Sequence, residues 1–272
     1  NNFVKDPSGD NTTNLFYGGD IQGNIWRFQW NTTNSSFDLL KVVQVTDKDG
    51  NAQPITTRLE LVQGQSGGTL PRILVATGKL LGVGDLSTNA TQSIYGFDDK
   101  DTGFSSSASW RSSLKRSELK DVTAPDGTKT RTLQCKGTAS ECKDNAIGWY
   151  IELPDSGERV NVDLRLAGAT LVVASNIPSN EPCVSGGTGW INYINFQTGG
   201  PVNEGPGGEG PAGVPVTDGL IMGNDLSATK DGNVTSHVSP SAYPDKPKDI
   251  PIPTTTPKPK GKRMSWRELI NQ

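Results

Sequence analysis

Oxygen-bearing side chains alternate along the first residues of the chain. Asp6, Ser8, Asp10 and Asn14 each carry a side-chain oxygen, and Thr12 offers its backbone carbonyl. This is the spacing of a calcium turn, in which positions 1, 3, 5 and 9 supply side-chain oxygens and position 7 a carbonyl. Since only the two aspartates are charged, we expect weak Ca²⁺ affinity. The same residues also suit a surface turn held by side-chain to backbone hydrogen bonds, and the sequence leaves both interpretations open.

A predicted β-hairpin follows this turn directly. Residues 15–17 (LFY) favour a strand, and 18–24 (GGDIQGN) contain the breakers and turn formers that end it. From 25 to 30 (IWRFQW) the chain alternates, which places Trp26, Phe28 and Trp30 on one face of a strand. A hairpin with an aromatic face is typical of a propeller blade or a sandwich.

This opening stretch and six later segments resemble the PilY/PilC family of type IV pilus tip adhesins and assembly factors. The later segments, in family order, are LVATGK (74–79), QSIYGFD (92–98), GWYIEL (148–153), GERV (157–160), PC with GG (182–183, 186–187) and SWREL (265–269). The departures are Ser8 and Asn14 in the calcium turn and a Gly/Pro-rich segment after residue 199.

The resemblance implies a fold, a place and a set of partners. It implies an all-β chain that forms the C-terminal blades of a β-propeller with long loops and an extended tail, in an exported bacterial protein at the pilus tip. Its implied roles are pilus assembly, the balance of extension against retraction, and surface attachment. The implied partners are minor pilins, a host or abiotic surface, and the upstream part of the same polypeptide.

Composition agrees with an extracellular all-β protein. The chain has 272 residues, which suggests one large or two small domains, and a formal net charge of -3. This charge argues against a nucleic-acid-binding surface, because such a surface would show a basic stripe. The chain has no initiating Met and no apolar run long enough to span a membrane, so we expect a mature or truncated piece.

The predicted strands recur at short intervals between Gly, Asn and Asp, as in a sandwich or propeller. Residues 1–198 are predicted to form the propeller portion, including a hairpin from 118 to 133 and a strand pair from 148–153 and 159–166. Residues 199–262 are predicted to be an insertion that is flexible to 213, carries one last strand around 219–223, and becomes an extended Pro/Lys-rich linker from 240. Residues 263–272 are predicted to be a docking segment.

Three cysteines are present, Cys135, Cys142 and Cys183. The first two bracket a polar loop and are predicted to close it as a disulfide, which requires an oxidising compartment. Cys183 is then either a buried apolar residue or the partner of a cysteine outside the chain. In the tail, Trp266, Leu269 and Ile270 are expected to dock on the chain itself or on a partner, unless they form a frayed end.

Residues for catalysis are few, and the sequence predicts that the protein is not an enzyme. The single histidine, His237, falls in a predicted Ser/Pro/Asn-rich linker, where a general base would have no fixed geometry. Two alternatives remain. One is a calcium-stabilised glycan-binding propeller that uses Trp110, Trp149 and Trp190. The other is a glycoside-cleaving propeller with a carboxylate pair such as Asp98 and Asp99, in a stretch (98–101) that otherwise predicts a solvated turn.

Overall fold

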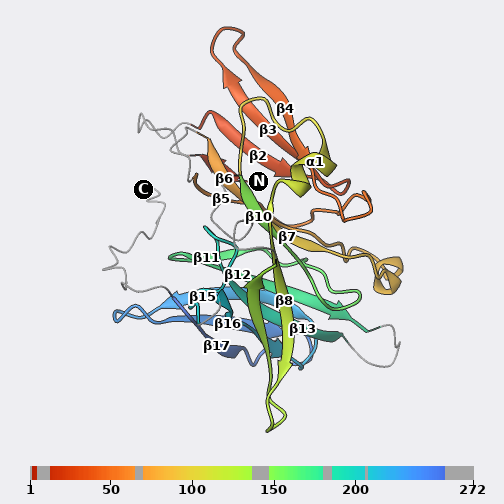
Figure 1. Ribbon diagram of the computed structural model, residues 1–272, viewed down its shortest axis with the longest axis vertical. Helices are drawn as coiled ribbons and strands as arrows, with labels where there is room; N and C mark the ends of the chain where they lie inside the picture. The colour runs from red at the N-terminus through yellow and green to blue at the C-terminus, as the bar shows by residue number, and fades with distance from the viewer. Residues whose placement is uncertain are drawn as a thin grey trace, which may run out of the picture.

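In the computed structural model, the regular secondary structure of the described residues is almost all β-strand, and the strands form three sheets (Figure 1). The structure describes residues 2–4, 13–64, 70–136, 147–179, 186–205 and 208–254, with side chains from residue 13 onward. Within these ranges the helices are short, Val83–Ser87 and α1 (Ser107–Ser112). The predicted all-β class is therefore confirmed.

The first sheet contains four strands in chain order, each antiparallel to the next. They are β1 (Asn2–Val4), β2 (Leu15–Gly19), β3 (Asn24–Asn31) and β4 (Ser36–Gln44). The turn between β2 and β3 forms because Asp20 accepts hydrogen bonds from the amides of Gln22 and Asn24, both at 2.9 Å, and because Gly23 adopts a positive φ of 75°. The predicted opening hairpin is thus present.

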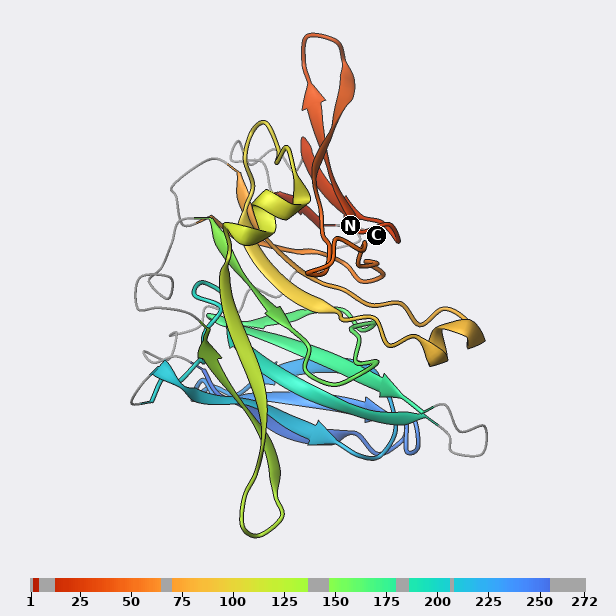
Figure 2. The ribbon, with the colours of Figure 1, turned by 45° about the vertical axis from the view of Figure 1, so that its right-hand side comes forward.

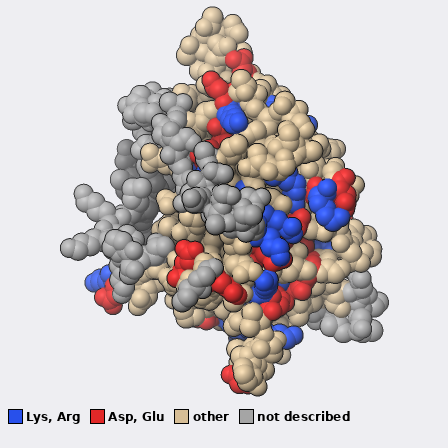
Figure 3. Space-filling model, viewed as in Figure 1, with Lys and Arg blue, Asp and Glu red and all other residues tan. Residues whose placement is uncertain are grey.

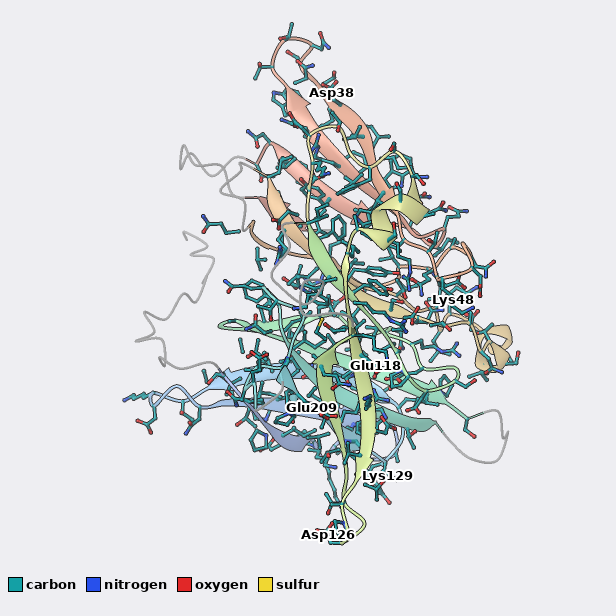
Figure 4. The ribbon with its side chains drawn as sticks, in the orientation of Figure 1. Asp38, Lys48, Glu118, Asp126, Lys129 and Glu209 are labelled. Atoms are coloured by element: carbon teal, nitrogen blue, oxygen red, sulfur yellow. The ribbon has the colours of Figure 1, made fainter. Side chains whose placement is uncertain are left out.

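The second sheet has ten strands, in the order β11-β12-β13-β14-β9-β8-β10-β7-β6-β5. Its strands are β5 (Glu60–Gln63), β6 (Pro71–Ala76), β7 (Ser93–Asp98), β8 (Lys115–Thr123), β9 (Lys129–Cys135), β10 (Gly148–Glu152), β11 (Arg165–Ala167), β12 (Thr170–Pro178), β13 (Gly187–Asn195) and β14 (Gly210–Val216). The predicted hairpin from 118 to 133 is β8–β9, and Figure 4 shows Asp126 at its tip, at the opposite end of the molecule from Asp38.

The pairing of 148–153 with 159–166 was predicted wrongly. Strand β10 pairs instead with β7 and, in parallel, with β8. Arg159 makes only an isolated bridge to Asn176. Its buried guanidinium donates to the carbonyls of Lys79 (3.1 Å) and Thr88 (2.7 Å), and so this segment crosses to the 79–88 loop rather than lying beside β10.

The third sheet, β15 (Ile221–Ala228), β16 (Val234–Pro240) and β17 (Lys248–Ile252), lies below the second (Figure 2). Strand β15 is the last strand expected near 219–223. Two expectations for this region were wrong. Strand β14 begins inside the stretch 199–213 that was expected to be flexible, and β17 lies inside the linker that was expected from 240. Gly213 allows β14 to lie close to the Asn192 side chain of β13, because a Cβ at position 213 would lie 3.0 Å from Asn192 Oδ1. Pro251 is tolerated because β17 is an edge strand.

Three apolar clusters hold the sheets together. The first joins β2–β4 to β6, β7 and α1, where Phe97 and Trp110 rings meet at 5.0 Å. The second lies against the ten-stranded sheet around Trp149, and the third between β12–β13 and the third sheet. Gly96 is needed in the second cluster, since a Cβ there would approach the Trp149 ring to 2.6 Å.

A buried arginine ties β9 to its surroundings. The guanidinium of Arg131 contacts Asp121 (2.8 Å), Asp155 (2.8 Å) and Glu158 (2.7 Å), and lies 4.0 Å from the Trp190 ring. Burial acts to lower the pKa of Arg131, but hydrogen bonds and charges of Glu158 and Asp121 raise it overall. The arginine therefore stays charged, and it fixes the long β8–β9 hairpin to the 155–158 turn.

Candidate functional site

One face of the first sheet is apolar and exposed. Phe28, Trp30, Phe37 and Leu39 are 38%, 39%, 46% and 58% exposed, and Phe16 is half-buried beside them. We call these five side chains the aromatic face. Monomeric proteins rarely expose contiguous apolar surface unless something binds it, and so this face is the candidate interaction surface.

Strand register brings the aromatic face together. Phe16 lies opposite Phe28, Phe28 opposite Leu39, and Trp30 opposite Phe37. The ring of Phe37 contacts Phe16 at 5.5 Å and Trp30 at 5.1 Å, both edge to face. A hollow of about 300 Å³ is lined by Phe16, Tyr17, Phe28 and Phe37. Such a preformed apolar hollow suits one inserted side chain of a partner.

The aromatic face lies on β2 and on the β3–β4 hairpin, which protrudes from the body of the molecule (Figure 2). In Figure 3 the end of the β3–β4 hairpin is mostly free of charged side chains, whereas charged groups of both signs gather over the middle of this view. The other face of the same sheet packs Tyr17, Ile25 and Val43 into the first cluster. The sheet is therefore anchored on one side and open on the other.

A buried ion pair anchors this sheet to the ten-stranded sheet. Arg27 on β3 contacts Asp99, just after β7, at 2.9 Å, and the Tyr17 hydroxyl donates to the same Asp99 oxygen at 2.7 Å. Arg27 also donates to the carbonyl of Asp101 at 2.6 Å. Burial raises the pKa of Asp99 and of Tyr17, although the hydrogen bonds of Tyr17 and Arg27 act to lower that of Asp99.

The solvated turn predicted at 98–101 is therefore corrected for its first two residues. Asp98 and Asp99 are both buried, and Arg72 binds Asp98 at 2.7 Å. Each carboxylate serves an arginine far away in the sequence, which no local pattern reveals. Since both are engaged in ion pairs, this pair gives no support to the glycoside-cleaving alternative.

Of the predicted calcium ligands, only Asn14 lies among the described residues. It is exposed, and its carbonyl accepts a hydrogen bond of 2.7 Å from the Trp30 amide, so the turn leads directly into the hairpin. Asp6, Ser8, Asp10 and Thr12 lie outside the described residues. The described ranges contain no group of three or more His, Cys, Asp or Glu side chains placed to hold a metal ion. The calcium turn stays a prediction.

The other predicted positions have mixed outcomes. Cys135 ends β9, whereas Cys142 and Cys183 lie outside the described residues, and the disulfide stays a prediction. The tail residues Trp266, Leu269 and Ile270 also lie outside them.

The tryptophans proposed for glycan binding are core residues. Trp110, Trp149 and Trp190 are 2%, 1% and 5% exposed, and Arg131 covers one face of Trp190. None of them offers an open ring for a sugar. Among the described residues, the exposed aromatic side chains are instead Phe28, Trp30, Phe37 and the separate Tyr243. The sequence predicted Phe28 and Trp30 as members of one face.

His237 was placed in a linker, and this was wrong. It lies on β16, where its Nε2 is 2.7 Å from the Ser227 hydroxyl and its Nδ1 is 2.6 Å from Asp249 Oδ1. The three residues sit on three neighbouring strands, and their meeting depends on strand register. Sequence reasoning missed the site because it recognised neither β17 nor the pairing of β16.

The chain is 30% identical over 284 residues to a type IV pilus biogenesis factor PilY1 homolog of Xylella fastidiosa, a match that covers 95% of the chain and 21% of that protein. It is 28% identical to the type IV pilus biogenesis factor PilY1 of Pseudomonas aeruginosa (strain UCBPP-PA14), over 72% of the chain and 21% of that protein. The chain thus spans about a fifth of the length of these relatives. No family model matches it.

Among solved structures, the C-terminal domain of Pseudomonas aeruginosa PilY1 matches with a TM-score of 0.64 at 19% identity, over 88% of this chain and 58% of that one. This likeness confirms the predicted propeller-type fold. Within the described residues, no helix has the length and apolarity needed to cross a membrane.

The Arg27–Asp99 pair yields a stability prediction. Replacing Arg27 with Met leaves the Asp99 carboxylate buried without its cation, and should lower the free energy of unfolding by about 3–5 kcal/mol. The double variant Arg27→Met/Asp99→Asn should recover part of this loss. Urea denaturation of both variants and of Tyr17→Phe measures the effect. Equal stability of Arg27→Met and the unmodified chain would contradict the anchoring role of this pair.

Proposed function

Because this chain is homologous to PilY1-type pilus biogenesis factors and has the fold of the PilY1 C-terminal domain, we propose that it serves type IV pilus biogenesis as a binding domain. The observation that carries this proposal is the sequence similarity, which extends over 95% of the chain. In this proposal the domain acts outside the cell, at the pilus tip, and promotes both pilus assembly and surface attachment.

We further propose that the aromatic face is where the domain meets a minor pilin. A protruding, rigidly anchored apolar surface fits a lasting contact between proteins, because aromatic side chains contribute most to such interfaces. The hollow between Phe16, Phe28 and Phe37 would receive one apolar side chain of the pilin. The described residues that line this hollow carry no charge, which favours an apolar partner surface over the anionic headgroups of a membrane.

Calcium is proposed as a modulator of this surface. The turn that carries Asp6, Ser8, Asp10, Thr12 and Asn14 leads directly into β2, so an ion bound there would order the base of the aromatic sheet. With two charged ligands, the dissociation constant should lie near 10⁻⁴ to 10⁻³ M, roughly the range of weak extracellular sites.

Isothermal calorimetry of the chain with CaCl₂ tests the calcium proposal. We expect a binding heat that Asp10→Ala abolishes and that Asp126→Ala, a change at the far hairpin tip, leaves unaltered. If the unmodified chain gives no heat up to several times that concentration range, or if Asp10→Ala binds as well as the unmodified chain, the turn is an ordinary surface turn.

The pilus proposal is tested in the source bacterium, in the complete gene product. Phe28→Ser/Trp30→Ser/Phe37→Ser should reduce surface pili and attachment several-fold while the protein level is unchanged. Met222→Ser, an exposed apolar residue on β15, is the matched control and should have no effect. Normal piliation in the triple variant would show that the aromatic face is not used, and normal piliation after deletion of residues 13–254 would remove the proposed function itself.

A further inference from the structure

We propose that Ser227, His237 and Asp249 form a nucleophilic site in which Ser227 attacks the carbonyl carbon of small, accessible esters. The Ser227 hydroxyl lies 2.7 Å from His237 Nε2, and His237 Nδ1 lies 2.6 Å from Asp249 Oδ1. A nucleophile within hydrogen-bond reach of a base that a third group orients is the arrangement that activates serine in unrelated folds. This inference goes beyond the proposed pilus role, which needs no catalysis.

Sheet register, not loop conformation, sets the geometry. His237 is directly opposite Asp225 on β15 and Asp249 on β17, and Ser227 lies two residues beyond Asp225. Side chains two apart on a strand share a face, and so all four project from the outer face of the third sheet. The inner face packs Val238, Ile250 and Ile252 into the third cluster, which holds the three strands in place.

Two carboxylates flank His237, one on each neighbouring strand. Asp249 accepts the hydrogen bond from Nδ1, and thereby leaves Nε2 to face the hydroxyl. Asp225 flanks the ring from the other strand, and Arg165 on β11 holds this carboxylate at 3.1 Å. Lys248 is directed elsewhere, with its Nζ 3.4 Å from the carbonyl of Pro215.

A backbone donor lies next to the nucleophile. The Thr229 amide donates to the Asn233 carbonyl at 2.9 Å, so 229 and 233 form a hydrogen-bonded pair. Along an antiparallel pair of strands, hydrogen-bonded residue pairs alternate with non-hydrogen-bonded pairs. Ser227 and Thr235 are therefore the next hydrogen-bonded pair, and Ala228, which lies between, forms a non-hydrogen-bonded pair with Val234. The N–H of Ala228 consequently points away from β16. Strand β15 is an edge strand of this sheet. The Ala228 N–H can therefore donate to a carbonyl oxygen as it becomes negative.

The reaction follows from these positions. Ser227 Oγ bonds to the ester carbonyl carbon while its proton passes to His237 Nε2. The tetrahedral oxyanion then expels the alcohol, which takes that proton and leaves an acyl group on Ser227. Water next gives a proton to Nε2 and attacks the acyl carbon, after which Ser227 recovers its proton and a carboxylic acid leaves. Because the site lies on an open sheet face, we expect slow turnover of small esters with good leaving groups.

The test uses the full chain with diisopropyl fluorophosphate as covalent probe and p-nitrophenyl acetate as substrate. We expect one adduct, mapped by peptide mass to Ser227, and acetate ester hydrolysis at least tenfold faster than for the heat-unfolded chain. Ser227→Ala should abolish both. Ser239→Ala, which changes a serine on the neighbouring strand β16, is the control and should retain both. Melting curves of the variants verify that each is folded.

Two further readouts separate catalysis from a merely structural hydrogen-bond chain. Asp249→Asn should slow labelling about tenfold, since general-base assistance typically contributes at least that much. The labelling rate should also fall from pH 8 to pH 5 as the imidazole takes up a proton. Absence of an adduct at Ser227, or an adduct whose rate ignores both Asp249→Asn and pH, would overturn the proposal and leave the three residues as a cross-strand contact. Neither outcome bears on the pilus role.

Discussion

The arrangement of this molecule depends on a buried charge pair between its first two sheets. Arg27 and Asp99 are separated by 72 residues and meet at 2.9 Å with almost no exposure to solvent. Either charge alone would be costly in that position, and so the first sheet can pack on the second only in the orientation that joins them. Tyr17 closes the same cluster from β2. Because this side of the sheet is committed to the body, its aromatic side remains outward.

The elements that were predicted correctly depend on residues that are neighbours in the sequence. The β2–β3 and β8–β9 hairpins follow from Gly, Asn and Asp at the turns and from alternation in the strands, which are properties of neighbouring residues. The burial of Asp98 and Asp99, the parallel pairing of β8 with β10, and the meeting of Ser227 with His237 and Asp249 depend on partners in other strands. Composition misled most between 199 and 254, where Gly and Pro predict mobility although β14 and β17 use them at a close approach and at a sheet edge.

The two candidate sites are built in the same way, although one is an apolar surface and the other is a group of polar side chains. The aromatic face and the Ser227 site are each the outer face of a small sheet whose inner face is packed into an apolar cluster. They lie on the first and third sheets, on either side of the ten-stranded sheet (Figure 2). Cross-strand register places the side chains in both cases. Binding to one surface therefore leaves the other accessible.

Photocrosslinking in piliated cells shows whether the aromatic face contacts a minor pilin. A photoreactive phenylalanine analogue is placed at Phe37 in the complete gene product, and at Asp126 as the control at the opposite end of the molecule (Figure 4). We expect irradiation to join the position 37 probe, and not the position 126 probe, to a minor pilin identified by mass spectrometry. Crosslinks to other regions of the same polypeptide, or equal pilin yields from both positions, would contradict it.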